Sequence, residues 1–86
     1  MKKLGRILHG NEQFLVARAD WVPKIGIKVQ DTSRKPIGRI TDVFGPVNSP
    51  YLTIQPTRGL KADNIVKLHG SEIYIGRVRH YAGKKK

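Results

Sequence analysis

The alternation of apolar and polar residues along the chain predicts short β-strands. It is clearest over residues 25–30, where Ile25, Ile27 and Val29 are expected to face a core. Lys28 and Gln30 are expected to face water. Residues 14–17 are apolar at successive positions, which indicates a strand covered on both sides, with a short helix as the main rival. The remaining strands are predicted over residues 6–9, 13–18, 37–44, 51–55 and 72–81, with turn residues between them.

Two of these strands change the face on which their apolar residues fall, and in both the change follows a glycine. Ile37 and Ile40 cannot share one face unless an extra residue lies between them, so a β-bulge is expected at Gly38. Gly76 stands in a similar pattern, and strands that bend at glycine favour a closed barrel. Residues 65–68 are either a short strand or apolar residues that hold a loop. The count is six strands with no convincing helix, which predicts an all-β fold, a single small six-stranded closed barrel.

The turn between the fourth and fifth predicted strands is unusually apolar and rigid. Two prolines and a glycine restrict it, and rigid apolar loops lose little conformational entropy on docking, which suits a contact with another protein. The equal alternative is that Phe44, Val47 and Tyr51 fold inward and plug one end of the barrel. A second apolar loop, residues 21–23, either extends this surface or caps the core. The candidate partner-binding residues are Phe44, Gly45, Pro46, Val47, Pro50, Tyr51, Trp21 and Pro23.

Size and charge restrict the classes of function. Eighty-six residues suffice for one domain, expected over residues 1–83, followed by a flexible basic tail at 84–86. Seventeen Lys and Arg against six Asp and Glu give a net charge of +11, which is typical of proteins that work near nucleic acid, although a role in solubility is the alternative. There is no cysteine, no apolar run long enough to span a membrane and no signal peptide, so we expect a soluble intracellular protein.

Catalytic patterns are scarce in this chain. No two carboxylates have the spacing of an acid–base pair, and His9, His69 and His80 lack the spacing of metal ligands. Phosphate-binding glycine loops and a nucleophile elbow are also missing, so we expect neither an enzyme nor a bound cofactor. The candidate RNA-proximal residues are Arg77, Arg79, Lys84, Lys85 and Lys86. If the terminal strands are neighbours, these charges join those near the start of the chain in one phosphate-binding patch; a solvated basic face is the alternative.

Four segments together resemble a known family. Residues 38–51 read Gly-Arg-Ile-Thr-Asp-Val-Phe-Gly-Pro-Val-Asn-Ser-Pro-Tyr, and residues 4–9, 23–31 and 72–76 match as well. The chain resembles, over nearly its whole length, the archaeal form of the glycine–arginine-rich-type (Gar family) accessory subunit of H/ACA ribonucleoproteins. The glycine–arginine tails of eukaryotic members are absent, and residues 57–71 are longer and more charged than the family pattern needs.

The resemblance implies a barrel of the elongation-factor and reductase type. It also implies a non-catalytic subunit that docks on the catalytic domain of a dyskerin-type pseudouridine synthase. Such a subunit assists loading, release and turnover of substrate RNA in rRNA modification and ribosome biogenesis, and meets the H/ACA guide RNA and the other small subunits only indirectly. The archaeal form implies a cytoplasmic location, whereas the eukaryotic members would be nucleolar, and no membrane or small-molecule substrate is implied. The competing hypothesis is a barrel that binds RNA directly, like a ribosomal protein or a ribonuclease P subunit.

Overall fold

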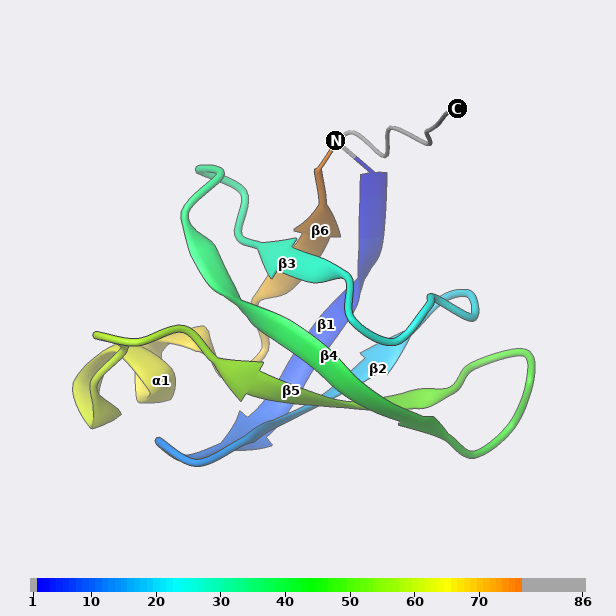
Figure 1. The fold of residues 1–86 in the computed structure, drawn as a ribbon, viewed down its shortest axis with the longest axis horizontal. Helices are drawn as coiled ribbons and strands as arrows, with labels where there is room; N and C mark the ends of the chain where they lie inside the picture. The colour runs from blue at the N-terminus through cyan, green and yellow to red at the C-terminus, as the bar shows by residue number, and fades with distance from the viewer. Residues whose placement is uncertain (1, 77–86) are drawn as a thin grey trace.

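Six antiparallel strands close into a barrel in the computed structural model, which describes residues 2–76 (Figure 1). The elements are β1 (Lys2–Gly10), β2 (Leu15–Ala19), β3 (Lys28–Gln30), β4 (Pro36–Phe44), β5 (Tyr51–Pro56), α1 (Ala62–Leu68) and β6 (Glu72–Ile75). The strand order around the barrel is β1-β2-β5-β4-β3-β6, so β1 and β4 lie on opposite sides. The six-stranded closed barrel confirms the fold expected from the sequence.

The core is built from the inward-facing residues of every strand. Alternation puts one residue in two inside, and each fully buried Leu or Ile contributes about 1.5–3 kcal/mol relative to an exposed one. No polar or charged side chain is buried among the described residues. The buried apolar residues are Leu4, Ile7, Leu15, Ala17, Ala19, Val29, Ile37, Ile40, Leu52, Ile54, Ile65, Ile73 and Ile75.

The strand expected over residues 25–30 is shorter than its sequence pattern. Val29 is buried and Ile27 packs partly against the core, but Ile25 is 63% exposed. The chain turns at Ile25 and Gly26, where Gly26 has a φ of 97°, so β3 begins only at Lys28. Phe14 is also exposed and precedes β2, so the prediction that residues 14–17 are covered on both sides was wrong at that position.

The expected bulge lies beside Gly38 rather than at it. Val29 pairs with Gly38 and Gln30 with Pro36, so Ile37 is the extra residue of β4 opposite β3. The pairing of β4 with β5 also changes register, and there Thr41 is the extra residue of β4. Gly38 is required for another reason: a Cβ atom there would overlap the carbonyl oxygen of Gln55 on the adjacent strand. The bulge expected after Gly76 and the strand expected to reach residue 81 lie outside the described residues.

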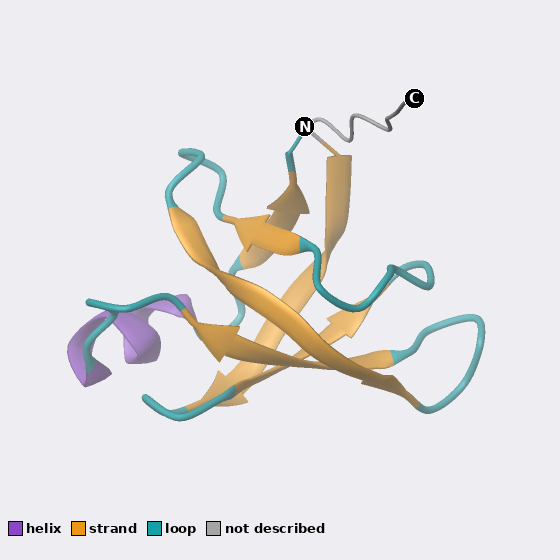
Figure 2. Ribbon diagram, viewed as in Figure 1, coloured by secondary structure: helices purple, strands orange, loops and turns teal. Residues whose placement is uncertain are grey.

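Helix α1 corrects the prediction of a strand or loop over residues 65–68 (Figure 2). Ile65 is buried and Leu68 is partly buried against the barrel, and their spacing of three residues puts both on one helical face. Asp63 in the first turn and Lys67 in the last turn suit the helix dipole. The Asn64 Oδ1 atom accepts a hydrogen bond of 3.2 Å from the backbone N–H of Lys61. Within residues 2–76 no helix is long and apolar enough to cross a membrane.

Candidate functional site

The apolar turn between β4 and β5, which we call the corner (residues 44–51), projects from one end of the barrel (Figure 1). Val47 is 78% exposed and Phe44 is 47% exposed, whereas Pro50 is buried and Tyr51 is half-buried. Of the two alternatives left open by the sequence, the outward orientation therefore describes Phe44 and Val47. The inward orientation holds only in part, for the half-buried Tyr51, and Pro50, a candidate for partner binding, is buried instead of exposed.

The aromatic rings of the corner form a supported stack. Phe44 and Tyr51 pair at the end of the β4–β5 ladder, and their ring centroids lie 5.7 Å apart with an interplanar angle of 23°. The guanidinium of Arg18 on β2 lies 5.2 Å from the centroid of the Tyr51 ring. Stacked aromatic pairs and cations over rings each add stabilisation beyond burial alone. The exposed Phe44 ring thus rests on Tyr51 of β5, which is in turn supported by Arg18 of β2.

Hydrogen bonds hold the loop of the corner against β2. Arg18 donates from Nε to the Ser49 hydroxyl at 2.7 Å, and the backbone N–H of Ala19 donates to the carbonyl of Pro50 at 2.8 Å. Within the loop, the Ser49 N–H donates to the carbonyl of Pro46 at 3.2 Å. The exposed side chain of Val47 therefore projects from a loop whose backbone is held by these hydrogen bonds. Such a surface loses little conformational freedom on docking.

In the second apolar loop, two residues cover the end of the core and a third is exposed to solvent. Pro23 is buried and Trp21 is half-buried against the core, with its indole N–H donating to the carbonyl of Lys3 at 2.9 Å. The ammonium of Lys2 lies 4.4 Å from the Trp21 ring centroid. Val22 is exposed, as is Ile25 beyond it. Trp21 and Pro23 therefore cap the core, whereas Ile25 is an exposed apolar residue that the sequence pattern had assigned to the core. The glycine that follows it was the available signal of a turn.

The terminal strands are neighbours, as the patch hypothesis required. Lys3 of β1 pairs with Tyr74 of β6, and the Lys3 ammonium lies 3.2 Å from the Glu72 carboxylate. The hydrogen bond donated by the Tyr74 hydroxyl, followed by the nearby Lys3 ammonium, lowers the pKa of Glu72; the same hydrogen bond raises the pKa of Tyr74. Cations near the start of the chain are thus partly neutralised. The candidate RNA-proximal residues Arg77, Arg79 and Lys84–Lys86 lie outside the described residues.

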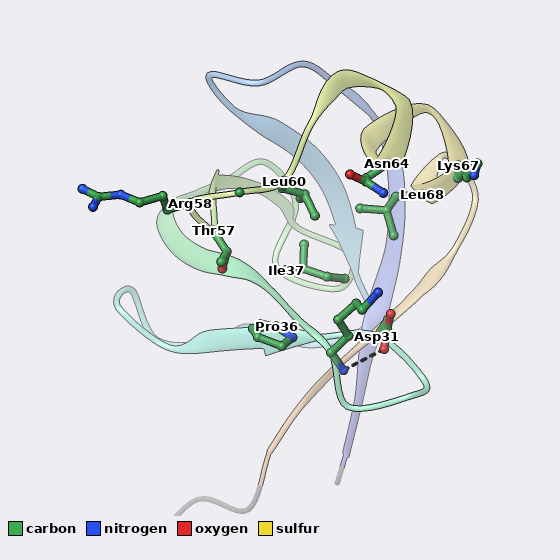
Figure 3. A pocket seen from close by; sticks show the side chains of 11 residues that line it. Asp31, Pro36, Ile37, Thr57, Arg58, Leu60, Asn64, Lys67 and Leu68 are labelled. Atoms are coloured by element: carbon green, nitrogen blue, oxygen red, sulfur yellow. Dashed lines mark hydrogen bonds between the residues drawn. The ribbon is translucent and has the colours of Figure 1, made fainter.

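Residues 57–68 form one wall of a pocket of about 460 Å³ beneath α1 (Figure 3). Ile37, Leu60 and Leu68 contribute apolar side chains to its lining. Asp31 lies at its edge, where its Oδ1 atom accepts backbone N–H bonds from Ser33 and Lys35 and so stabilises the β3–β4 turn. Within residues 2–76 no group of three His, Cys, Asp or Glu side chains is placed to hold a metal ion.

Comparison with known proteins assigns this chain to a family. Residues 1–82 match the family described as "Gar1/Naf1 RNA binding region". The chain belongs to this family. A solved structure described as the Gar1 domain of Naf1 has a TM-score of 0.71 and 27% sequence identity, covering 86% of this chain and 81% of that one. The Gar1/Naf1 assignment confirms the resemblance inferred from residues 38–51.

Relatives of this Gar1/Naf1 domain occur in archaea and in fungi. An uncharacterised protein of Methanothermobacter thermautotrophicus is 35% identical over 77 residues, which cover 88% of this chain and 84% of that protein. The H/ACA ribonucleoprotein complex subunit GAR1 of Botryotinia fuckeliana is 29% identical over 75 residues, which cover 85% of this chain. The match spans only 33% of that fungal protein. The shared part therefore corresponds to the barrel domain.

Proposed function

We propose that this Gar1/Naf1 domain is a non-catalytic subunit of an archaeal H/ACA RNA-guided pseudouridylation complex and works in the cytoplasm. It docks on the catalytic domain of a dyskerin-type pseudouridine synthase and assists loading, release and turnover of substrate RNA. The observation that carries the proposal is the family match over residues 1–82, together with fungal relatives named as H/ACA subunits. The other small subunits and the guide RNA are reached through the synthase.

The corner is the proposed docking surface. Interface energy concentrates in a few apolar or aromatic side chains that enter pockets of the partner, and an exposed, pre-ordered apolar loop supplies such side chains. Val47 and Phe44 meet this description because they are exposed while the backbone around them is held by β2 and β5. Trp21 and Pro23, which cap the core, are not part of this proposed surface, and Ile25 is a separate exposed apolar residue.

A binding experiment without RNA tests this proposal. The purified chain is mixed with the synthase alone, and complex formation is measured by isothermal titration calorimetry. We expect a complex at micromolar concentration, and Val47→Asp is expected to weaken it by at least about tenfold because a carboxylate would lose its hydration in the interface. Absence of a complex of the unaltered chain would refute the docking proposal.

Val66→Asp is the matched control. Val66 is 64% exposed and lies on α1, at the opposite end of the longest axis of the molecule from the corner (Figure 1). The two substitutions introduce the same charge at an exposed valine, so only the location differs. Equal affinity of the control and the unaltered chain is the expected result. If Val66→Asp weakens binding and Val47→Asp does not, the docking surface lies around the helix instead.

The second candidate function is direct RNA binding by the barrel. The name of the matching family and the net charge of +11 favour it. It predicts tight binding of RNA by the isolated chain, with an affinity that falls steeply as salt rises. Weak binding that does not depend on RNA sequence favours the docking subunit instead.

A further inference from the structure

A row of polar side chains crosses the outer face of three adjacent strands. Lys28 of β3 pairs directly with Arg39 of β4, and Arg39 pairs with Gln55 of β5. All three are exposed, and their neighbours Val29, Ile40 and Ile54 point into the core. Like charges directly opposite each other on adjacent strands destabilise a sheet, so this pairing is not explained by the stability of the fold.

The row lies in an open groove of about 660 Å³ on this face. Pro36 and Pro56 lie along the groove beside Lys28 and Arg39. Arg58, just after β5, also lines the groove, and its side chain extends away from the pocket beneath α1 (Figure 3). The groove thus collects three cations from β3, β4 and the end of β5. None of its lining residues is acidic.

These three cations differ from those on the other side of the barrel. The side chains of Lys28, Arg39 and Arg58 make no hydrogen bond or ion pair with any residue in the described range 2–76. By contrast, the cations of β1 and β2 are engaged: Lys3 and Arg6 face Glu72, Lys2 lies over Trp21, and Arg18 bonds Ser49. The groove therefore gathers three cations from β3, β4 and the end of β5 that no described carboxylate neutralises.

We propose that this groove binds the phosphate backbone of RNA without reading its sequence. Lys28, Arg39 and Arg58 each contact a phosphate, with Gln55 and Thr57 available as uncharged donors beside them. An acidic protein segment is the less suitable occupant because protein interfaces centre on large apolar or aromatic anchors, and none of the large exposed hydrophobic side chains lines the groove. Recognition of RNA bases requires aromatic side chains on which they can stack or groups that bond to their edges. A groove that offers mainly positive charge is instead suited to contact with the phosphates of the RNA backbone.

The groove goes beyond the proposed docking function because it adds a weak, sequence-independent RNA contact to the docking subunit. Docking on the synthase uses the corner, whereas RNA contact uses the outer face of β3, β4 and β5. A subunit with both surfaces holds substrate RNA weakly beside the enzyme on which it is docked. The two proposals fail separately, because synthase binding is measured without RNA and RNA binding without synthase.

Salt-dependent RNA binding by the full chain tests the groove. The probes are fluorescein-labelled oligouridylate and oligoadenylate of about 20 nucleotides, longer than a typical single-strand site. Each lost phosphate contact reduces the slope of log K against log salt by about 0.7. We expect Lys28→Gln/Arg39→Gln to reduce the slope by about 1.4, and to lower affinity about 25-fold at 0.1 M salt, equally for both probes. The melting temperature is expected to stay unchanged or rise, because the substitutions remove repulsion.

Arg6→Gln is the control matched to a single Arg39→Gln variant. Both arginines are exposed in the middle of a strand, and β1 and β4 lie on opposite sides of the barrel. Arg39→Gln is expected to lower the slope by about 0.7, and Arg6→Gln to leave it nearly unchanged. Three results overturn the proposal: equal effects of the two single variants, no binding of either oligonucleotide at about 50 mM salt, or binding of polyglutamate as tight as that of RNA.

Discussion

Gly45 is the position at which the conformation of the corner is most directly testable. Its φ of 92° lies in the left-handed region, and a Cβ atom there would lie 3.0 Å from Cδ2 of Tyr51. Gly45→Ala therefore introduces both backbone strain and a steric contact. The strain costs about 1–2 kcal/mol. The contact adds part of the roughly 0.5–1.5 kcal/mol of an aromatic pair, because the Tyr51 ring must move against Phe44 and Arg18.

Gly59→Ala separates these two contributions. Gly59 has a φ of 97°, but a Cβ atom there has no neighbour within 4 Å, so the substitution introduces the strain alone. Urea unfolding followed by circular dichroism gives the free energy of unfolding of each variant. We expect a loss of about 1–2 kcal/mol for Gly59→Ala and about 2–3 kcal/mol for Gly45→Ala. At about 4–8 °C per kcal/mol, the two variants also differ measurably in melting temperature.

Two results would refute this reasoning. Equal destabilisation by the two variants would show that the Tyr51 ring yields without cost, and that the aromatic stack does not hold the corner. No destabilisation by Gly59→Ala would show that a positive φ is not costly in these loops. A further expected result is weaker synthase binding by Gly45→Ala than by Gly59→Ala, because only the first substitution displaces the stack beneath Phe44.

Three other substitutions test the barrel, its helix and its terminal strands. Ile40→Ala removes a fully buried side chain from the centre of β4 and is expected to cost about 2–5 kcal/mol in urea unfolding; a loss below that range would indicate a loosely packed core. Ile65→Ala removes the buried contact of α1 and is expected to speed amide hydrogen exchange in the helix while the strands stay protected; equal exchange would contradict the role of Ile65. The hydrogen bond from Tyr74 is the main cause that lowers the pKa of Glu72 below 4.5 in the folded protein, so the ionised carboxylate stabilises the fold. This stabilisation is fully present above pH 4.5 and is lost as the pH falls through the lowered pKa of Glu72 in the folded state. Glu72→Gln should therefore flatten the acid side of the melting-temperature profile, and an unchanged profile would count against the interaction.

Most of the barrel follows from local sequence pattern, and the exceptions have physical causes. The predicted strands over residues 37–44 and 51–55 correspond to β4 and β5, and the change of face after Ile37 indicated the bulge in β4. The sequence pattern misplaced Ile25 because the alternation of apolar residues includes Ile25, whereas the backbone turns at Gly26 and the strand begins only at Lys28. Helix α1 has seven residues, which provide two inward contacts, Ile65 and Leu68, too few to distinguish a helix from a strand by periodicity.

The candidate surfaces were predictable to different degrees. The rigidity of the corner follows from its prolines and glycine, but the outward direction of Phe44 depends on its pairing with Tyr51 and on the support of Arg18 from β2. These contacts join segments far apart in sequence. The cationic groove could not be found by inspection of charge runs, because Lys28 and Arg39 become neighbours only through the pairing of β3 with β4. The basic tail attracted attention in the sequence, whereas two of the three groove cations, Lys28 and Arg39, lie within the sheet.

The pairing of β1 with β6 also sets the order in which a newly made chain can reach its native state. β1 is synthesised first, yet one of its two hydrogen-bonding edges is completed only by residues 72–75, and β6 also completes β3. Until those residues leave the ribosome, the nascent chain has two open strand edges, which are prone to pairing with other chains. Closure is thus a late, non-local event, and most of the chain must emerge before the barrel can offer its finished surfaces to any partner.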